Sequence, residues 1–181
     1  MTIDGFVAGP NGENDWVFLP GPQDPAALQF TTDMAASCDT ILAGRKLAGG
    51  FNTYWQDIAE NHPESPWNTF AKHMVNHRKI IFSRNAETTV PGRNVEVENG
   101  DLATVVKALK EQDGKDILVY GGVEFVRALI NLNLIDEYYM VINPVAIGVG
   151  QIIFSEKKIM QLQSSTAYTN GKLLNVYVPV G

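Results

Sequence analysis

Three short segments of the chain could hold phosphate groups: two combine a glycine or a hydroxyl residue with cations, and the third is a pair of glycines. They are Gly44-Arg45-Lys46, Ser83-Arg84 and Gly121-Gly122. An arginine binds a phosphate through paired hydrogen bonds, whereas a lysine acts as a point charge. Glycines let the backbone approach a ligand closely. Taken one at a time, each segment also has an ordinary structural interpretation, as an exposed basic helix end or a sharp turn.

The di-glycine segment is placed to hold a pyrophosphate. It follows residues 116–120, a predicted buried strand, and Val123 begins a helix that is predicted to reach Asn131. Free N–H groups at the start of a helix, together with the helix dipole, favour an anionic ligand. Glu124 in the first turn competes for the same positive potential, and the segment lacks the complete dinucleotide-binding fingerprint.

All three segments follow predicted strands. Residues 39–43, 79–82 and 116–120 are short and mostly apolar, and each ends directly before one of the three segments. Parallel strands that are joined by helices bind ligands at the edge formed by their carboxyl ends. A hydroxyl and a guanidinium at Ser83 and Arg84 would suit a phosphate on a ribose, by which proteins favour NADP over NAD. Together the three segments predict phosphate contacts at one edge of one sheet.

Asp4 and Trp16 are candidates for a second kind of contact. Asp4 lies within residues 3–8, a predicted strand that is otherwise apolar, where an unpaired carboxylate would be costly. It therefore either faces solvent on an edge strand or lines a site, and it could also simply shape the turn with Gly5. Trp16 could flank a planar ligand, although a tryptophan is more often part of a core.

The elements that would position these residues alternate between strand and helix. Helices are expected at residues 26–37, which Asp24 and Pro25 begin, at residues 68–76, and after Asp101. After residue 131 the pattern changes to strands at 138–145 and 151–154 and a hairpin at 167–178 that turns at Asn170-Gly171. We therefore expect an α/β fold with a mixed, mostly parallel central sheet, flanked by helices and ending in an antiparallel hairpin.

Composition narrows the class of protein. The chain has 181 residues, of which 45% are hydrophobic, and a net charge of −6, so we expect one domain that covers residues 1–181. An acidic chain has no overall field that would attract nucleic acid. Neither a signal segment nor an apolar run of about 20 residues is seen, so we expect no membrane span. With Cys38 as its one cysteine, the chain suits a reducing compartment, and we expect it in the cytoplasm.

A metal site is not expected. His73 and His77 are four residues apart on a predicted helix, but sequence spacing offers no third ligand. A single cysteine also cannot supply the zinc site of a nucleobase deaminase.

The order and spacing of these motifs resemble the dihydrofolate-reductase-like superfamily. The chain is most similar to the reductase domain of bacterial riboflavin biosynthesis, the C-terminal half of the bifunctional deaminase-reductase, and to its stand-alone relatives. The resemblance covers nearly the whole chain and is carried by residues 3–9, 14–16, 41–46, 82–84, 116–122, 134–138 and 144–150.

The resemblance implies NADPH as the hydride donor and, in many relatives, a homodimer. By this similarity, Gly44, Arg45, Lys46, Ser83 and Arg84 would hold the adenosine phosphates. Gly121 and Gly122, with the helix start at Val123, would take the pyrophosphate. Asp4, Gly5 and Trp16 would lie near the nicotinamide and the reducible substrate.

The implied activity is NADPH-dependent reduction of a small pyrimidine- or pterin-like substrate, of the type that reduces 5-amino-6-(5-phosphoribosylamino)uracil. Two departures bear on it. Leu47 stands where relatives commonly have a threonine that contacts phosphate. Gly21 follows Leu19-Pro20 and the next acid, Asp24, comes late, which disfavours folate reduction. A dihydrofolate or pterin reductase and a non-catalytic nucleotide- or flavin-binding protein remain the alternatives.

Overall fold

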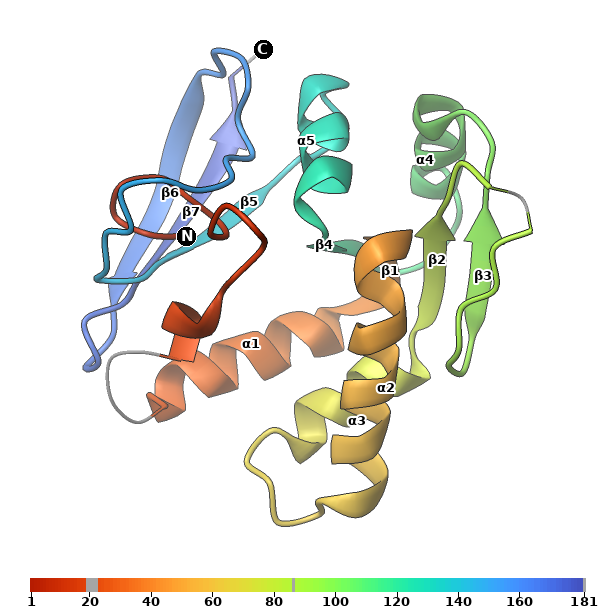
Figure 1. The fold of residues 1–181 in the computed structure, drawn as a ribbon, viewed down its shortest axis with the longest axis horizontal. Coiled ribbons are helices and arrows are strands. Elements are labelled where there is room, and N and C mark those ends of the chain that lie inside the picture. The colour runs from red at the N-terminus through yellow and green to blue at the C-terminus, as the bar shows by residue number, and fades with distance from the viewer. Residues whose placement is uncertain (19–22, 86, 181) are drawn as a thin grey trace. The chain divides into compact units, whose positions relative to one another are not determined.

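The computed structural model describes residues 1–18, 23–85 and 87–180 (Figure 1). Leu19-Pro20 and Gly21, which bear on folate reduction, therefore lie outside the described residues. The chain divides into two compact units, one formed by Met1–Ala27 with Arg127–Gly181 and the other by Leu28–Val126. That the whole chain acts as one domain stays a prediction.

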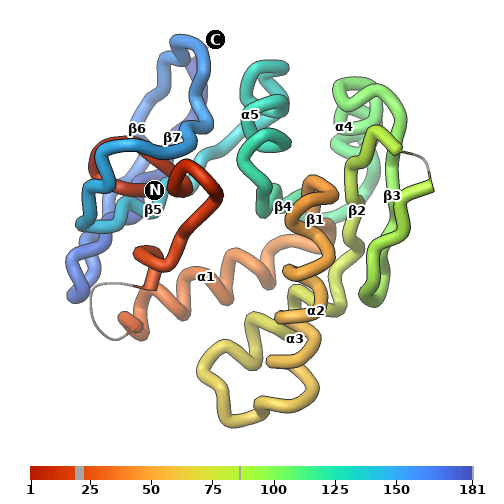
Figure 2. Tube along the Cα trace, in the orientation of Figure 1, coloured from red at the N-terminus to blue at the C-terminus, as the bar shows by residue number. Residues whose placement is uncertain are grey.

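The unit Leu28–Val126 is built on a parallel sheet. Its four strands, in the order β3-β2-β1-β4, are β1 (Cys38–Gly44), β2 (Arg78–Phe82), β3 (Val95–Glu98) and β4 (Asp116–Gly121). The helices of the chain are α1 (Pro25–Ser37), α2 (Arg45–Asn61), α3 (Asn68–Asn76), α4 (Leu102–Lys110) and α5 (Val123–Asn131). Figure 2 traces α1 running directly into β1 without a loop.

Helices cover both faces of this sheet. The connection from β1 to β2 contains α2 and α3, and the connection from β3 to β4 contains α4 and runs in the opposite direction across the sheet. Because such crossovers are right-handed, α4 lies on the face opposite to α2 and α3. Both faces of β1 are therefore buried, which explains why Ile41, Leu42 and Ala43 are consecutive apolar residues rather than alternating with polar ones.

The core of this unit lies between the sheet and the helices α1, α2 and α3. Its buried members are Ala35, Ile41, Phe51, Phe70 and Met74. A second buried cluster contains Ala43, Ala48 and Ile81. Ile41 and Ala43 are two residues apart on β1, so their side chains lie on the same face of that strand. Both clusters therefore lie on that face. The α2 helix therefore packs over the carboxyl half of β1, where the first candidate segment begins.

The unit Met1–Ala27 with Arg127–Gly181 contains an antiparallel sheet. Its strands, in the order β5-β7-β6, are β5 (Tyr138–Ile142), β6 (Met160–Ala167) and β7 (Leu173–Pro179), and a short helix η1 (Asp15–Phe18) precedes α1. The hairpin predicted at Asn170-Gly171 is confirmed, with a φ of 82° at Gly171. Asp24 accepts hydrogen bonds from the N–H groups of Ala26 and Ala27, as predicted for the cap of α1.

The predicted α/β class, with parallel strands first and antiparallel strands last, is confirmed. The helix after Asp101 is also confirmed, since the Asp101 carboxylate accepts from the Thr104 N–H at 2.9 Å. In the part of the chain that the structure describes, no helix is long and apolar enough to span a bilayer.

Two predicted strands are wrong. Residues 3–8 form a turn with Gly5 at a φ of 91°, and only Thr2 and Ala8 make isolated bridges to other strands or loops. In residues 151–154 only Gln151 forms a bridge. The apolar side chains in both segments pack in loops and not in a ladder, which composition alone cannot show. Conversely, β3 and most of β6 were missed because their residues are polar and largely exposed.

Candidate functional site

The three glycine- and cation-bearing segments follow neighbouring strands of the parallel sheet. The strand register pairs Gly44 with Phe82 on one side of β1 and Ala43 with Gly121 on the other. The start of α2 at Arg45 thus lies between Ser83 and the di-glycine turn. The prediction that these segments meet at one edge is confirmed by the register; their role in binding stays a prediction.

The edge between β1 and β4 is a topological switch point. The chain leaves β1 towards β2 on one side, and it reaches β4 from β3 by the opposite route. Open α/β sheets bind ligands in the crevice that such a reversal creates. Two helices, α2 and α5, begin directly at these two strand ends, and Gly44 caps α2 without a side-chain hydrogen bond. Two sets of first-turn N–H groups, and the positive ends of two helix dipoles, are therefore available to an anion.

The glycines at this edge are close-packed to different degrees. A Cβ added to Gly44 would lie 3.0 Å from the Cβ of Phe125 and 3.9 Å from the backbone nitrogen of Gly122. Packing alone therefore requires a glycine at position 44, whether or not a ligand binds. A Cβ on Gly122 would meet nothing within 4 Å, so this residue faces open space. Gly121 has a φ of 137°, and the Gly121–Gly122 peptide bond is cis.

The basic side chains at this edge are exposed and make few ion pairs with the described residues. The Lys46 Nζ lies 3.3 Å from the Glu124 Oε2, and the two side chains are 77% and 75% exposed. An ion pair of that kind contributes about 0–1 kcal/mol, so a phosphate could draw Lys46 away from it. Arg45 and Arg84 are exposed, and neither makes an ion pair within residues 1–18, 23–85 and 87–180. This edge therefore carries positive charge that the described protein does not neutralise.

Ser83 has a structural role that the sequence did not indicate. Its Oγ lies 2.7 Å from the Thr88 Oγ1 and accepts a hydrogen bond from the Asn85 N–H at 3.1 Å. Thr88 thus adds a second hydroxyl beside the candidate phosphate contact. No local pattern marks Thr88, because it is brought there by the loop that follows β2.

A pair of aromatic rings also lies at this edge. Phe82, the last residue of β2, stacks on Phe125 in the first turn of α5, with the ring centroids 5.2 Å apart and 27° between the planes. The pair packs beside Gly44 and links β2 to α5. Sequence reasoning missed it because the stacking depends on the order of strands in the sheet.

Asp4 is held by hydrogen bonds from a loop that is distant in sequence. Its Oδ2 accepts from the N–H groups of Ile147 at 3.0 Å and Gly148 at 2.8 Å. A hydrogen bond from the Thr2 side chain and these backbone bonds hold the pKa of Asp4 below its usual range. The residue is exposed, and it is ionised at neutral pH. These contacts favour the interpretation in which Asp4 shapes the turn, while its catalytic role stays a prediction.

Trp16 is buried in η1, and its indole N–H is unusual. Only 6% of the residue is exposed, and the Nε1 atom has no acceptor among the described residues. Buried N–H groups are almost always satisfied by protein, water or ligand. The geometry therefore allows Trp16 to donate to a bound molecule, as well as to pack in a core.

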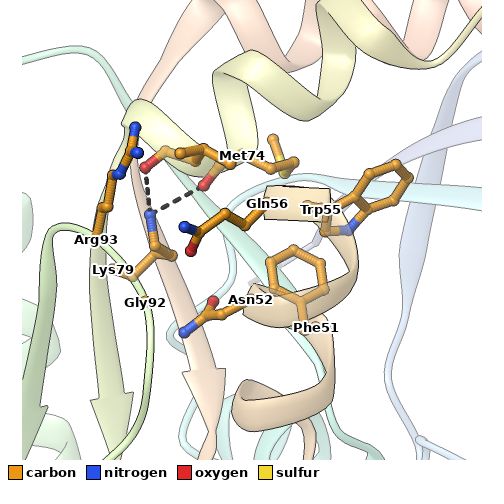
Figure 3. Close-up of a pocket in the computed structure, with 9 residues that line it drawn as sticks. Phe51, Asn52, Trp55, Gln56, Met74, Lys79, Gly92 and Arg93 are labelled. Atoms are coloured by element: carbon orange, nitrogen blue, oxygen red, sulfur yellow. Dashed lines mark hydrogen bonds between the residues drawn. The ribbon is translucent and has the colours of Figure 1, made fainter. Parts of the chain in front are cut away.

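Figure 3 shows a pocket at the other end of the sheet, where Phe51, Asn52, Trp55 and Gln56 of α2 face the start of β2 and the loop before β3. Its space is about 10 Å³, which is enough for roughly one water molecule. The Asn52 Oδ1 is buried there without a partner among the described residues. Such a pocket is too small for a cofactor.

Lys79 fills most of this corner. It is 2% exposed, and its Nζ donates to the carbonyl groups of Met74, Val75 and His77 at 2.8–2.9 Å. These carbonyls end α3, where no intrahelical donor is available. Burial lowers the pKa of Lys79 to about 8. The ammonium group thus caps a helix and is not free for catalysis.

A larger cavity of about 300 Å³ lies at the amino ends of β1, β2 and β4. It is lined by Asp39, Thr40, Arg78, Ile117 and residues of the loop after α4. Its charges are already met within the protein, because Arg78 makes two hydrogen bonds to Glu96, at 2.8 and 2.7 Å, and Asp39 accepts from the Lys115 N–H. The cavity therefore offers less to an anion than the carboxyl edge does.

The histidine pair does not form a metal centre. The rings of His73 and His77 are 5.6 Å apart, and the His77 Nε2 lies 2.7 Å from the Ala35 carbonyl oxygen. Over the described ranges, no three His, Cys, Asp or Glu side chains come together as a metal site.

Comparison with known proteins supports the resemblance seen in the motifs. The sequence model of the RibD C-terminal domain family matches residues 1–174. The chain is 32% identical to the uncharacterized protein YyaP of Bacillus subtilis (strain 168) over 180 residues, which cover 98% of this chain and 90% of YyaP.

Solved structures show the same fold. The chain is similar to a putative riboflavin biosynthesis protein from Shewanella sp. PV-4, with a TM-score of 0.69, 19% identity and coverage of 100% of this chain and 96% of that one. It is also similar to dihydrofolate reductase from Enterococcus faecalis in complex with NADP(H), with a TM-score of 0.55, 14% identity and coverage of 100% and 93%. The dihydrofolate-reductase-like fold expected from the sequence is confirmed.

Proposed function

Because the chain belongs to the RibD C-terminal domain family, we propose that it is an NADPH-dependent reductase of a small pyrimidine- or pterin-like substrate. The observation that carries the proposal is the edge between β2, β1 and β4. The starts of α2 and α5 meet there, and Gly44 caps α2 without a side-chain hydrogen bond. Open backbone at Gly122 and two arginines without an ion pair among the described residues lie at the same edge. A dinucleotide phosphate is an anion of the kind that such an edge stabilises.

In this proposal the phosphates of the cofactor have named partners. The di-glycine turn at Gly121 and Gly122, with the N–H group of Val123, holds the pyrophosphate, and Gly44 at the start of α2 lies beside the adenosine phosphates. Arg45, Lys46, Arg84 and the Ser83 hydroxyl hold the phosphates of the adenosine half. The bound cofactor supplies the hydride. The chain itself supplies charge, backbone donors and orientation, which can lower a barrier without covalent chemistry.

Trp16 and Asp4 are the residues proposed to contact the substrate. Trp16 has a buried N–H that lacks an acceptor among the described residues, so a substrate oxygen would satisfy it. Asp4 is ionised, and it can accept a hydrogen bond from a substrate N–H but cannot deliver a proton at neutral pH. Replacing Asp4 by Asn separates this role from a purely structural one. Turnover that falls ~10²-fold at an unchanged melting temperature supports the role, and a large loss of melting temperature assigns Asp4 to the turn.

The chain is further proposed to act as a cytoplasmic homodimer without nucleic-acid or membrane partners. The antiparallel sheet leaves apolar side chains uncovered, including Tyr139 and Val141 on β5, Leu162 on β6 and Leu173 on β7. Unprotected apolar strands of this kind need covering. Light scattering over a dilution series tests the proposal, and a mass of one chain at all micromolar concentrations contradicts it.

The proposed activity is tested by measuring NADPH oxidation against a panel of aminopyrimidines, pterins and flavins. We expect turnover with one of the pyrimidines or pterins and a rise in melting temperature with NADPH alone. Saturation at 100 times the dissociation constant adds about 2.7 kcal/mol of stability. Binding of NADPH without turnover on any member would leave the non-catalytic alternative, and no binding would overturn the proposal.

A further inference from the structure

An aromatic cluster lies beside the di-glycine turn. Tyr120, the residue before Gly121, packs its ring on Phe51 of α2 with the centroids 4.6 Å apart, and the ring of Phe70 on α3 is 6.4 Å away. Leu118, two residues earlier on β4, packs against the same core with α2 and α3, although the register of β4 with β1 shifts at Tyr120. The ring of Tyr120 therefore emerges on the α2 side of the sheet, at the carboxyl end of the strand.

A second tyrosine joins this cluster from α2. Tyr54 follows Phe51 by three residues, so the two side chains lie on the same face of the helix. Its ring packs on Trp55 with the centroids 4.8 Å apart. Desolvation, and then the nearby Tyr54, raise the pKa of Tyr120 to about 12. Tyr54 and Tyr120 thus belong to one aromatic cluster, joined through Trp55 and Phe51, and Tyr120 keeps its proton throughout the physiological range.

The hydroxyl groups of these two side chains are not used by the described part of the protein. Tyr120 is 38% exposed and Tyr54 is 53% exposed. Within the described residues, neither hydroxyl group makes a hydrogen bond. Packing on Phe51 needs only the ring, which a phenylalanine would supply equally well. The hydroxyl groups are therefore free to donate to a ligand.

We infer that Tyr120 and Tyr54 form the hydrogen-bonding wall of the substrate site, and that they recognise a flat, uncharged heterocycle through its carbonyl or ring-nitrogen acceptors. The inference rests on the proposed function, because it places the substrate next to the cofactor turn at Gly121. Aromatic rings favour a planar partner, and protonated phenols favour acceptor atoms. The members of the cluster are uncharged, so this wall does not select a phosphate group.

The test uses two conservative variants, Tyr120→Phe and Tyr54→Phe, and Tyr139→Phe as a matched control on β5. Each keeps the ring and removes one hydroxyl group. The ligands are lumazine and riboflavin as uncharged heterocycles and flavin mononucleotide as a phosphorylated one, titrated by fluorescence at saturating NADPH. NADPH affinity and melting temperature are measured separately for every variant.

We expect the wild type to bind lumazine or riboflavin, and each wall variant to bind it about 5- to 30-fold more weakly, as for the loss of a buried hydrogen bond. NADPH affinity should stay within about twofold, and the control should match the wild type. Equal heterocycle affinity in all variants, or no binding of either heterocycle by the wild type, overturns the inference. So does flavin mononucleotide that binds at least about tenfold more tightly than riboflavin, a preference of about 1.4 kcal/mol for the phosphate. Failure of NADPH itself to bind instead overturns the proposed function.

Discussion

The two ends of the parallel sheet differ in whether their charged side chains have partners within the described protein. At the amino ends of the strands lies the larger cavity, about 300 Å³, yet Arg78 and Asp39 beside it already have partners, and Lys79 nearby makes three hydrogen bonds. At the carboxyl ends, Arg84 has no ion pair in the described part of the chain, and Gly122 faces open space.

The difference shows that charged side chains and backbone N–H groups without partners in the protein mark a binding edge better than the volume of a cavity does. Leaving a charged group without a partner inside a protein is costly. The charged groups at the amino end are therefore paired, although the Asn52 Oδ1 in the small pocket has no partner among the described residues. The amino end is therefore interpreted as structural and the carboxyl end as functional. Variants at the two ends should separate the two interpretations.

The largest effect is expected from Lys79→Met at the amino end. The change removes the donor of three buried carbonyl groups at the end of α3 and should lower the free energy of unfolding by about 3 kcal/mol. Chemical denaturation measures this, with Lys72→Met on the exposed side of α3 as the control. NADPH affinity of the folded variant should be unchanged. A variant as stable as the wild type would show that the carbonyls find other partners.

The same lysine predicts a dependence of stability on pH. Its pKa is about 8 in the folded chain and about 10.4 when unfolded, so the unfolded state binds the extra proton between these values. The free energy of unfolding of the wild type, relative to Lys79→Met, should therefore rise as the pH increases from about 8 to 10.4, by up to about 3 kcal/mol. Below pH 8 the difference should be constant. A difference that falls with increasing pH would contradict the assigned pKa.

Arg84→Ala tests the carboxyl end. Loss of a charge-assisted hydrogen bond to the ribose phosphate should weaken NADPH about 10- to 100-fold and NADH hardly at all. The stability of the ligand-free protein should not change, because the guanidinium has no ion pair in the described residues. Titration calorimetry with both cofactors measures this, and Lys72→Ala is the control. Equal weakening of NADPH and NADH would place the residue away from the extra phosphate.

The smallest effect is expected from Glu124→Gln. Glu124 puts a negative charge in the first turn of α5 and pairs with Lys46 at 3.3 Å. Removing that charge should strengthen NADPH binding about two- to fivefold, since charges near helix ends contribute about 0.3–1 kcal/mol. The gain should shrink at high salt. If NADPH affinity falls instead, Glu124 contributes a contact rather than a competing charge.

The site edge could be predicted from the sequence because its signals are local. Gly44 is the last residue of a buried strand, and Ser83 directly follows another. Gly121 ends β4, which was predicted to be buried but is only half-buried because it lies at the edge of the sheet. The carboxyl ends of parallel strands necessarily share an edge. The helix caps at Asp24 and Asp101 were predicted for the same reason, since a cap and its N–H partners are at most three residues apart.

The features that were missed depend on contacts between distant residues. Asp4 was expected in a strand, but it binds the N–H groups of Ile147 and Gly148, more than 140 positions away. The packing of Tyr120 on Phe51 depends on how α2 lies on β4. Burial of Lys79 contradicts the usual preference of lysine for the surface, and only the end of α3 explains it.

Because Lys79 is buried and caps the end of α3, the chemical reactivity of its amine can report local unfolding. An amine-reactive reagent requires access to the Nζ, and the residue is 2% exposed with its three protons engaged. Exposed lysines such as Lys72 should be labelled at once, whereas Lys79 should be labelled only when the end of α3 separates from the start of β2. The rate at which mass spectrometry detects the modified Lys79 peptide therefore measures how often this part of the molecule opens.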